Sequence, residues 1–84
     1  MIKRYLFFMT PMCPNCADVH EYLSTVHIPG DEIDATEDAG MEVAQKYGVM
    51  SVPWVIFLDE EMNVVAHAQC VNDVKKIIEN KSLF

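Results

Sequence analysis

The sequence predicts an α/β domain in which one four-stranded mixed sheet is flanked by three helices. Two continuous apolar runs, at residues 2–9 and 53–58, have the length and composition of strands that are buried on both faces. Three other segments carry apolar residues at helical spacing. The elements follow the order β-α-β-α-β-β-α, in which the first two strands pair in parallel through a right-handed crossover.

The first strand and the first helix are expected at residues 2–9 and 14–26, joined by a loop at residues 10–12. Pro14 suits the start of a helix, because the N–H that it lacks would be unpaired there. The helix carries apolar residues at i, i+3, i+4 and i+7, namely Val19, Tyr22, Leu23 and Val26. The turn signal Pro29-Gly30 ends this unit.

The second strand is expected at residues 31–35, although its acidic residues are poor strand formers. The second helix begins at Thr36 or Asp38 and runs to Tyr47. Gly48 suits the left-handed conformation that ends many helices. The residues expected on the inward face of this helix are Met41, Ala44 and Tyr47.

A hairpin and a last helix complete the chain. Strands at residues 53–58 and 64–68 are joined by a short polar turn at residues 59–63, which predicts antiparallel pairing. The last helix begins at Asn72 or Asp73 and ends near Asn80. Its apolar face comprises Cys70, Val74, Ile77 and Ile78. We expect this face to bury Cys70, because free cysteine is among the most buried residue types.

Length, charge and cysteine content narrow the function. A chain of 84 residues with 51% hydrophobic residues predicts a single domain, residues 1–84. The net charge of −7 argues against nucleic acids and anionic membranes as partners, and it fits a protein partner with a basic docking surface as well as simple solubility. We expect no signal peptide and no membrane span, and three cysteines do not make a secreted disulfide scaffold. A cytoplasmic location fits best.

Two cysteines separated by two residues lie where the first strand ends and the first helix begins. Free N–H groups and the positive end of the helix dipole favour an anion at Cys13. Such a setting can lower a cysteine pKa from about 8.5 to between roughly 3.5 and 7.5. We therefore expect Cys13 to attack a partner's disulfide and Cys16, one turn further along, to resolve the mixed disulfide.

A Cys-x-x-Cys pair can also be half of a metal site. Structural zinc takes four ligands, usually from a second Cys or His pair. Here Cys70 stands alone, and the three histidines are scattered at positions 20, 27 and 67. A zinc or iron–sulfur site that uses Cys13 and Cys16 across a dimer is the alternative, and a redox-inert interaction domain is a third.

A second motif accompanies Cys13-Pro14-Asn15-Cys16: the stretch Tyr-Gly-Val-Met-Ser-Val-Pro at residues 47–53. With both motifs in place, the chain resembles thioredoxin-fold proteins at their small, glutaredoxin-like end. The resemblance implies the thioredoxin fold, a protein-disulfide reductase activity and no tightly bound cofactor beyond the redox-active disulfide. The partners that it implies are disulfide-containing proteins and an electron-donating reductase.

The resemblance also implies a cis peptide bond before Pro53, where the residues alone favour an ordinary trans proline at the start of a strand. The cis form would present the backbone of Val52 beside Cys13, so that an extended substrate segment can pair with it. The implied catalytic residues are Cys13 and Cys16. The implied substrate-binding residues are Met12, Pro14, Val52 and Pro53.

The chain departs from the family pattern at several positions, and these departures limit the activity and partners that we expect. Thioredoxins carry a tryptophan where this chain has Met12, and a buried carboxylate where it has Phe7, so the proton acceptor for Cys16 must be another group or water. The glycine pair of glutathione-binding glutaredoxins is missing from residues 66–73, which makes glutathione an unfavourable partner. We expect general disulfide reduction, with electron donation to ribonucleotide reductase as one instance that fits.

Four further residues each have more than one possible role. His20 shares a helix face with Cys16, and a solvated surface histidine is favoured over one that tunes Cys16 or completes a metal site. Trp54 either packs in the core or forms part of an apolar rim on which a partner docks. Met12 and Met50 are expected to flank the cysteines, where flexible thioethers suit a surface that accepts several partners.

Overall fold

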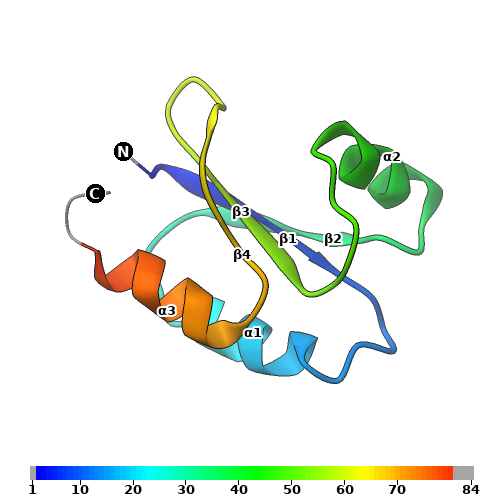
Figure 1. Ribbon diagram of the computed structural model, residues 1–84, viewed down its shortest axis with the longest axis horizontal. Coiled ribbons are helices and arrows are strands. Elements are labelled where there is room, and N and C mark those ends of the chain that lie inside the picture. The colour runs from blue at the N-terminus through cyan, green and yellow to red at the C-terminus, as the bar shows by residue number, and fades with distance from the viewer. Residues whose placement is uncertain (1, 81–84) are drawn as a thin grey trace.

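The computed structural model describes residues 2–80 and contains the predicted elements in the predicted order (Figure 1). Their bounds are β1 Arg4–Met9, α1 Cys16–Leu23, β2 Gly30–Asp34, α2 Asp38–Lys46, β3 Trp54–Leu58, β4 Val64–Ala68 and α3 Val71–Glu79. Among the described residues, no helix is long and apolar enough to cross a membrane.

The four strands form one mixed sheet in the order β2-β1-β3-β4. β1 pairs in parallel with β2 and antiparallel with β3, and β3 and β4 form the antiparallel hairpin that the short turn predicts. In Figure 1, α1 and α3 lie together, apart from α2. The predicted fold class, a thioredoxin fold with three flanking helices, is confirmed.

Successive residues of the two central strands face opposite sides of the sheet, as strand geometry requires. One core cluster contains Phe7 and Phe57 together with residues of α1 and α3. The other contains Phe8 and Ile56 together with Ala44 of α2. Phe7, Phe8 and Phe57 are each 1% exposed or less. The prediction that the two apolar runs are buried on both faces is therefore confirmed.

The first helix begins later than predicted. Residues 14 and 15 form a turn, with Asn15 at the N-cap position, so α1 starts at Cys16 rather than at Pro14. The helix also ends sooner than predicted, at Leu23. Ser24 and Thr25 donate their hydroxyl hydrogens to the carbonyls of Glu21 and Tyr22, and such local bonds compete with continuation of a helix.

Two predictions of buried residues are wrong. Cys70 is exposed, because it is the N-cap of α3 with an extended backbone (φ −150°, ψ 168°) and so lies off the apolar helix face. Met41 is 46% exposed, and the buried positions of α2 are Gly40 and Ala44. Ala44 is buried as predicted, and Gly40 rather than Met41 occupies the buried position one turn before it.

Gly40 allows α2 to approach the end of β2 closely. A Cβ at this position would lie 1.9 Å from the carbonyl oxygen of Asp34. Inside most helices a Gly→Ala change stabilises by about 0.5–1 kcal/mol. At Gly40 the same change should destabilise the protein, because the added Cβ would clash with a backbone atom, which cannot easily move aside. We expect Gly40→Ala to destabilise by about 1–3 kcal/mol in urea unfolding. Gln45→Ala, exposed on the same helix, is the control, and a stabilised Gly40→Ala protein would contradict the packing.

Two aspartates accept hydrogen bonds that hold turns in place. One oxygen of Asp59 accepts the N–H groups of Glu61 and Asn63, each at 2.9 Å, and closes the β3–β4 hairpin. Asp34 accepts the hydroxyl of Thr36 at 2.6 Å and its N–H at 2.9 Å, between β2 and α2. The pKa of Asp59 is lowered mainly by the bond from Asn63, and the pKa of Asp34 by the bonds from Thr36.

These lowered pKa values predict acid sensitivity. Because the folded pKa lies below the unfolded value of about 3.9, the unfolded chain binds more protons as the pH falls through this region. The free energy of unfolding should therefore decrease below about pH 4. Asp59→Asn and Asp34→Asn should each make this decrease shallower, measured by urea unfolding at a series of pH values. Asp18→Asn controls for loss of an exposed carboxylate; an unchanged slope in both test variants would contradict the assignment.

Candidate active site

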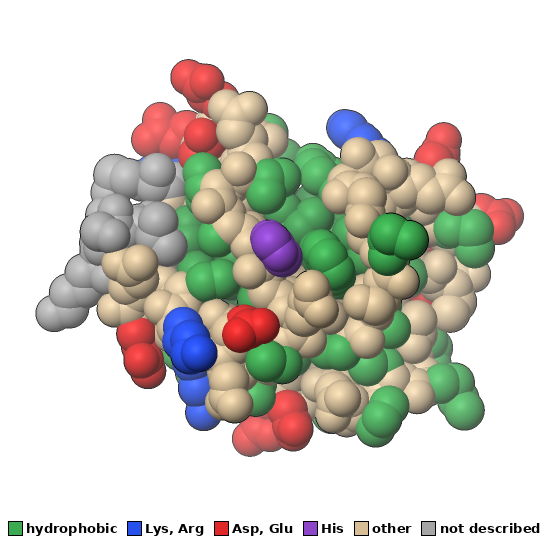
Figure 2. Space-filling view, in the orientation of Figure 1, with side chains coloured by type: hydrophobic (Ala, Val, Ile, Leu, Met, Phe, Trp, Pro, Cys, Tyr) green, Lys and Arg blue, Asp and Glu red, His purple; other side chains and the backbone are tan. Residues whose placement is uncertain are grey.

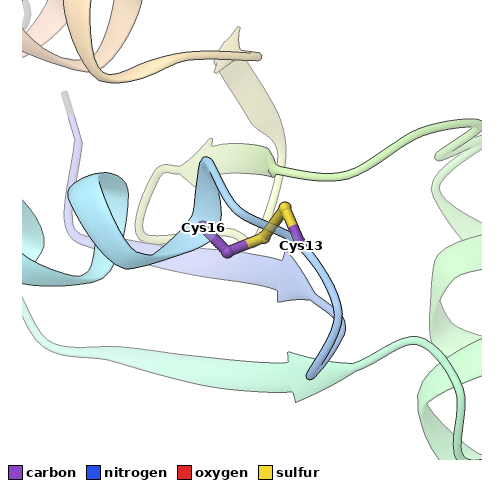
Figure 3. The surroundings of a disulfide bond; sticks show 2 residues. All are labelled: Cys13 and Cys16. Carbon is purple, nitrogen blue, oxygen red and sulfur yellow. A yellow bond between two sulfur atoms is a disulfide. The ribbon is translucent and has the colours of Figure 1, made fainter.

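The two cysteines of the motif lie together at the carboxyl end of β1. Cys13 is in the loop before α1, and Cys16 is the first residue of that helix. They form a disulfide across a Cα–Cα distance of 5.4 Å, and their side chains point toward each other (Figure 3). The loop is tightened by backbone hydrogen bonds from Cys13 N to Thr10 O at 3.2 Å and from Cys16 N to Cys13 O at 3.3 Å.

The two cysteines differ in their access to solvent. Cys16 is 5% exposed and belongs to the core cluster that α1 and α3 share with the sheet. Cys13 is half-buried and only packs against that cluster. A large partner therefore reaches Cys13 more easily than Cys16.

The loop before β3 packs against the same core cluster as Cys13. The Val52–Pro53 peptide bond is cis, Pro53 is buried, and half-buried Val52 packs against the cluster that Cys13 also contacts. Pro14 is exposed. Met12 and Met50 are 89% and 90% exposed. The structure thus presents two almost bare methionines on the loops that carry Cys13 and Val52.

Trp54 has a packing role and an exposed side. It is half-buried and packs against the core cluster on the α2 side of the sheet. Its ring stacks on His67 of β4, with centroids 5.3 Å apart and an interplanar angle of 9°. The face of the molecule that Figure 2 shows has green apolar areas around a purple histidine, with red acidic groups beside it and toward the edges.

A hollow of about 490 Å³ opens beside the disulfide. Its lining residues come from β1, the following loop, α1 and β2: Phe7, Met9, Thr10, Pro11, Cys13, Cys16, Ala17, His20, Glu21 and Glu32. Phe7 supplies an apolar wall where the family resemblance would place a carboxylate. The titratable side chains that share this hollow with the cysteines are those of His20, Glu21 and Glu32 within the described chain.

His20 and Glu32 contact each other through Nδ1 and Oε1. His20 is an exposed histidine on α1, as predicted, with its side chain 59% exposed, and Glu32 lies on β2 at 44%. No local sequence pattern marks Glu32 as a site residue. The signal that could have found it is the strand register, in which Glu32 stands opposite Phe7. Between residues 2 and 80, no group of three or more His, Cys, Asp and Glu side chains is arranged to hold a metal ion.

Comparison with known proteins relates this chain to glutaredoxins and thioredoxin-like proteins. The glutaredoxin family model matches residues 6–62. An SPbeta prophage-derived thioredoxin-like protein of Bacillus subtilis, YosR, is 39% identical over 51 residues. That alignment covers 61% of this chain and 61% of the relative, so the chain matches less than two thirds of the relative's length.

Solved thioredoxins share the fold. Thioredoxin 1 of Thermosipho africanus superimposes with a TM-score of 0.71 at 20% identity, over 94% of this chain and 98% of its own. Deadhead, a germline-specific thioredoxin of Drosophila melanogaster, gives a TM-score of 0.77 at 18% identity, over 96% and 80%. Thioredoxin O2 of Arabidopsis thaliana gives 0.75 at 19% identity, over 99% and 76%.

Proposed function

The chain belongs to the glutaredoxin family, and we propose that it reduces protein disulfides through Cys13 and Cys16. The observation that carries this proposal is the unequal burial of two cysteines that already form a disulfide with each other. The more accessible sulfur, that of Cys13, is the attacking one. The buried sulfur of Cys16 is protected from outside thiols and resolves the intermediate.

The reaction transfers two electrons in two exchanges. The Cys13 thiolate attacks one sulfur of the substrate disulfide, and the other substrate sulfur leaves as a thiolate that takes up a proton. The Cys16 thiolate then attacks Cys13 Sγ, and the remaining substrate sulfur leaves in the same way. The substrate is left as two thiols, and the protein holds the Cys13–Cys16 disulfide.

The substrate docks as an extended segment along the loop before β3. The backbone N–H and C=O of Val52 pair with it, as in strand addition. Met12, Pro14 and Pro53 border the same path, and exposed methionines adapt to side chains of varied shape. This proposal is supported by the exposure of Met12 and Met50 and by the contact of both Cys13 and Val52 with one core cluster.

Electrons return to the disulfide from a protein reductase, and the chain acts as a single cytoplasmic domain over residues 1–84. The net charge of −7 favours reductases and substrates with a basic docking surface, and it disfavours glutathione, whose carboxylates are anionic. Ribonucleotide reductase is one recipient that fits this chemistry.

The cysteine roles are tested by single substitutions. Cys13→Ser should abolish the protein's acceleration of insulin reduction by dithiothreitol, because the accessible sulfur of the pair is lost. Cys16→Ser should slow turnover at least tenfold and accumulate a mixed disulfide between Cys13 and the substrate, detected as a protein–substrate adduct in mass spectra. Exposed Cys70 provides the control, since Cys70→Ser should keep the wild-type rate. A Cys16→Ser protein with wild-type turnover would contradict the division of roles.

The docking path is tested at the two exposed methionines. Met50→Ser should raise KM for a peptide disulfide roughly fivefold with little change in kcat, which corresponds to about 40 Å² of apolar surface at about 25 cal/mol per Å². Met12→Ser should act in the same direction. Met62→Ser, at an exposed methionine in the turn between β3 and β4, is the matched control. Equal KM values for all four proteins would remove these methionines from the substrate site.

A further inference from the structure

We propose that His20, held by Glu32, accepts the proton of Cys16 when the mixed disulfide is resolved. The inference rests on the proposed reductase function and assigns it a residue beyond the two cysteines. It starts from the hollow beside the disulfide, where His20 and Glu32 come together from α1 and β2.

Resolution needs a proton acceptor because only the thiolate form of Cys16 can attack. Burial disfavours the charged form of a thiol, and Cys16 is 5% exposed. The neighbouring wall of the hollow is Phe7, an apolar ring that is itself 1% exposed and can accept no proton. The acceptor must therefore come from the open side of the hollow, or be water.

Helix geometry places His20 on the side of α1 that carries Cys16. The two residues are four apart, so they are neighbours on one helix face. Side chains on a helix lean toward its N-terminus, which directs His20 toward the first turn, where Cys16 lies. Both residues line the same hollow, so a transfer between them needs no path through the protein interior.

Strand register places Glu32 on the same side of the sheet as the cysteines. Glu32 stands opposite Phe7 in the parallel β1–β2 pair, and neighbours in register share one face of a sheet. An ionised carboxylate only accepts hydrogen bonds, so the contact between His20 Nδ1 and Glu32 Oε1 makes Nδ1 the protonated nitrogen. Nε2 of neutral His20 is then left as the acceptor, and the carboxylate stabilises the imidazolium that forms.

The titratable groups near His20 come from α1, β2 and the loop that carries Cys13, and Tyr5 of β1 lies close to Glu32. Glu32 of β2 is in direct contact, Glu21 follows on α1, and Cys13 comes from the loop. On β1, burial raises the pKa of Tyr5, with the charges of Glu32 and Asp31 adding to the effect, so its phenol stays neutral at physiological pH. These neighbours are neutral or negative, so none of them presents a like charge to the imidazolium that the step forms.

The step balances without an added reagent. The Cys16 S–H proton moves to His20 Nε2, directly or through one water. The thiolate attacks Cys13 Sγ and forms the internal disulfide, while the bond from Cys13 to the substrate breaks with its electron pair on the substrate sulfur. That sulfur takes up a proton from the imidazolium or from solvent, and His20 returns to its neutral form.

A chromogenic disulfide separates this step from the first attack. Reduced protein is mixed in a stopped-flow instrument with excess 5,5′-dithiobis(2-nitrobenzoate). The attack by Cys13 releases one thionitrobenzoate at a rate that depends on reagent concentration. Resolution by Cys16 releases a second at a rate that does not. The Cys70→Ser background removes the exposed third thiol, which would otherwise react.

His20→Gln should slow the concentration-independent phase about tenfold near pH 7. This is less than the roughly hundredfold or more that is usual for general base catalysis, because water can substitute in an open hollow. It should also flatten the rise of this phase with pH between about 5 and 8, the range in which histidine changes charge. The concentration-dependent phase should change less than twofold. Glu32→Gln should also slow the concentration-independent phase, because the imidazole loses the carboxylate that holds its Nδ1 side.

Matched substitutions control for the loss of a histidine or an acid elsewhere. His27→Gln and Glu42→Gln are both at exposed positions and should leave the two phases unchanged. If His20→Gln keeps the wild-type second phase and its pH profile, the inference is wrong, whatever the change in urea midpoint. If the wild-type protein itself releases no second thionitrobenzoate, the reductase proposal fails first. If His20→Gln does not fold, the rate of the second phase in Glu32→Gln decides, and a wild-type rate there would overturn the inference.

Discussion

The packing of β1 and β3 on both faces is the constraint on which the rest of the structure depends. The two strands lie side by side in the centre of the sheet, and every residue of β1 from Leu6 to Phe8 is buried on one side or the other. A shift of one residue in their register would exchange the two core clusters. The register therefore fixes which side Phe7 faces, and with it the wall of the hollow beside the cysteines.

The same constraint explains which features were predictable from the sequence. Buried central strands read as continuous apolar runs, and the short polar turn after β3 predicts its own hairpin. Cys13 and Cys16 are recognisable because their spacing and their place at the end of a strand are local properties. Glu32 was not recognisable in this way, because its position depends on pairing between strands that are far apart in the chain. Local reasoning also misplaced Cys70, since a helix pattern does not reveal that its first apolar member is the extended N-cap.

The start of α1 shows how a small boundary difference changes the chemistry. Cys16 is the first helical residue, so Cys13 lies outside the helix and is tied to it through the bond from Cys16 N to Cys13 O. A sulfur ahead of the first turn is still near the free N–H groups of the helix, where an anion is favoured. Placing Cys13 just outside the helix costs little conformational energy, because Asn15 between it and the helix already has helical backbone angles, φ −84° and ψ −12°.

The size of the domain explains why its titratable groups lie at the edge of the hollow. Within residues 2–80 the structure has no buried polar or charged side chain. An isolated carboxylate in the core would have to be desolvated, at a cost that a small core meets with difficulty. Phe7 instead fills this position with an apolar side chain that packs in the core. The acidic residue nearby is Glu32 on the neighbouring strand, where its side chain is exposed to water. His20 contacts that exposed acid and lines the same hollow as the buried sulfur, so the proposed proton transfer does not require a charge buried in the core.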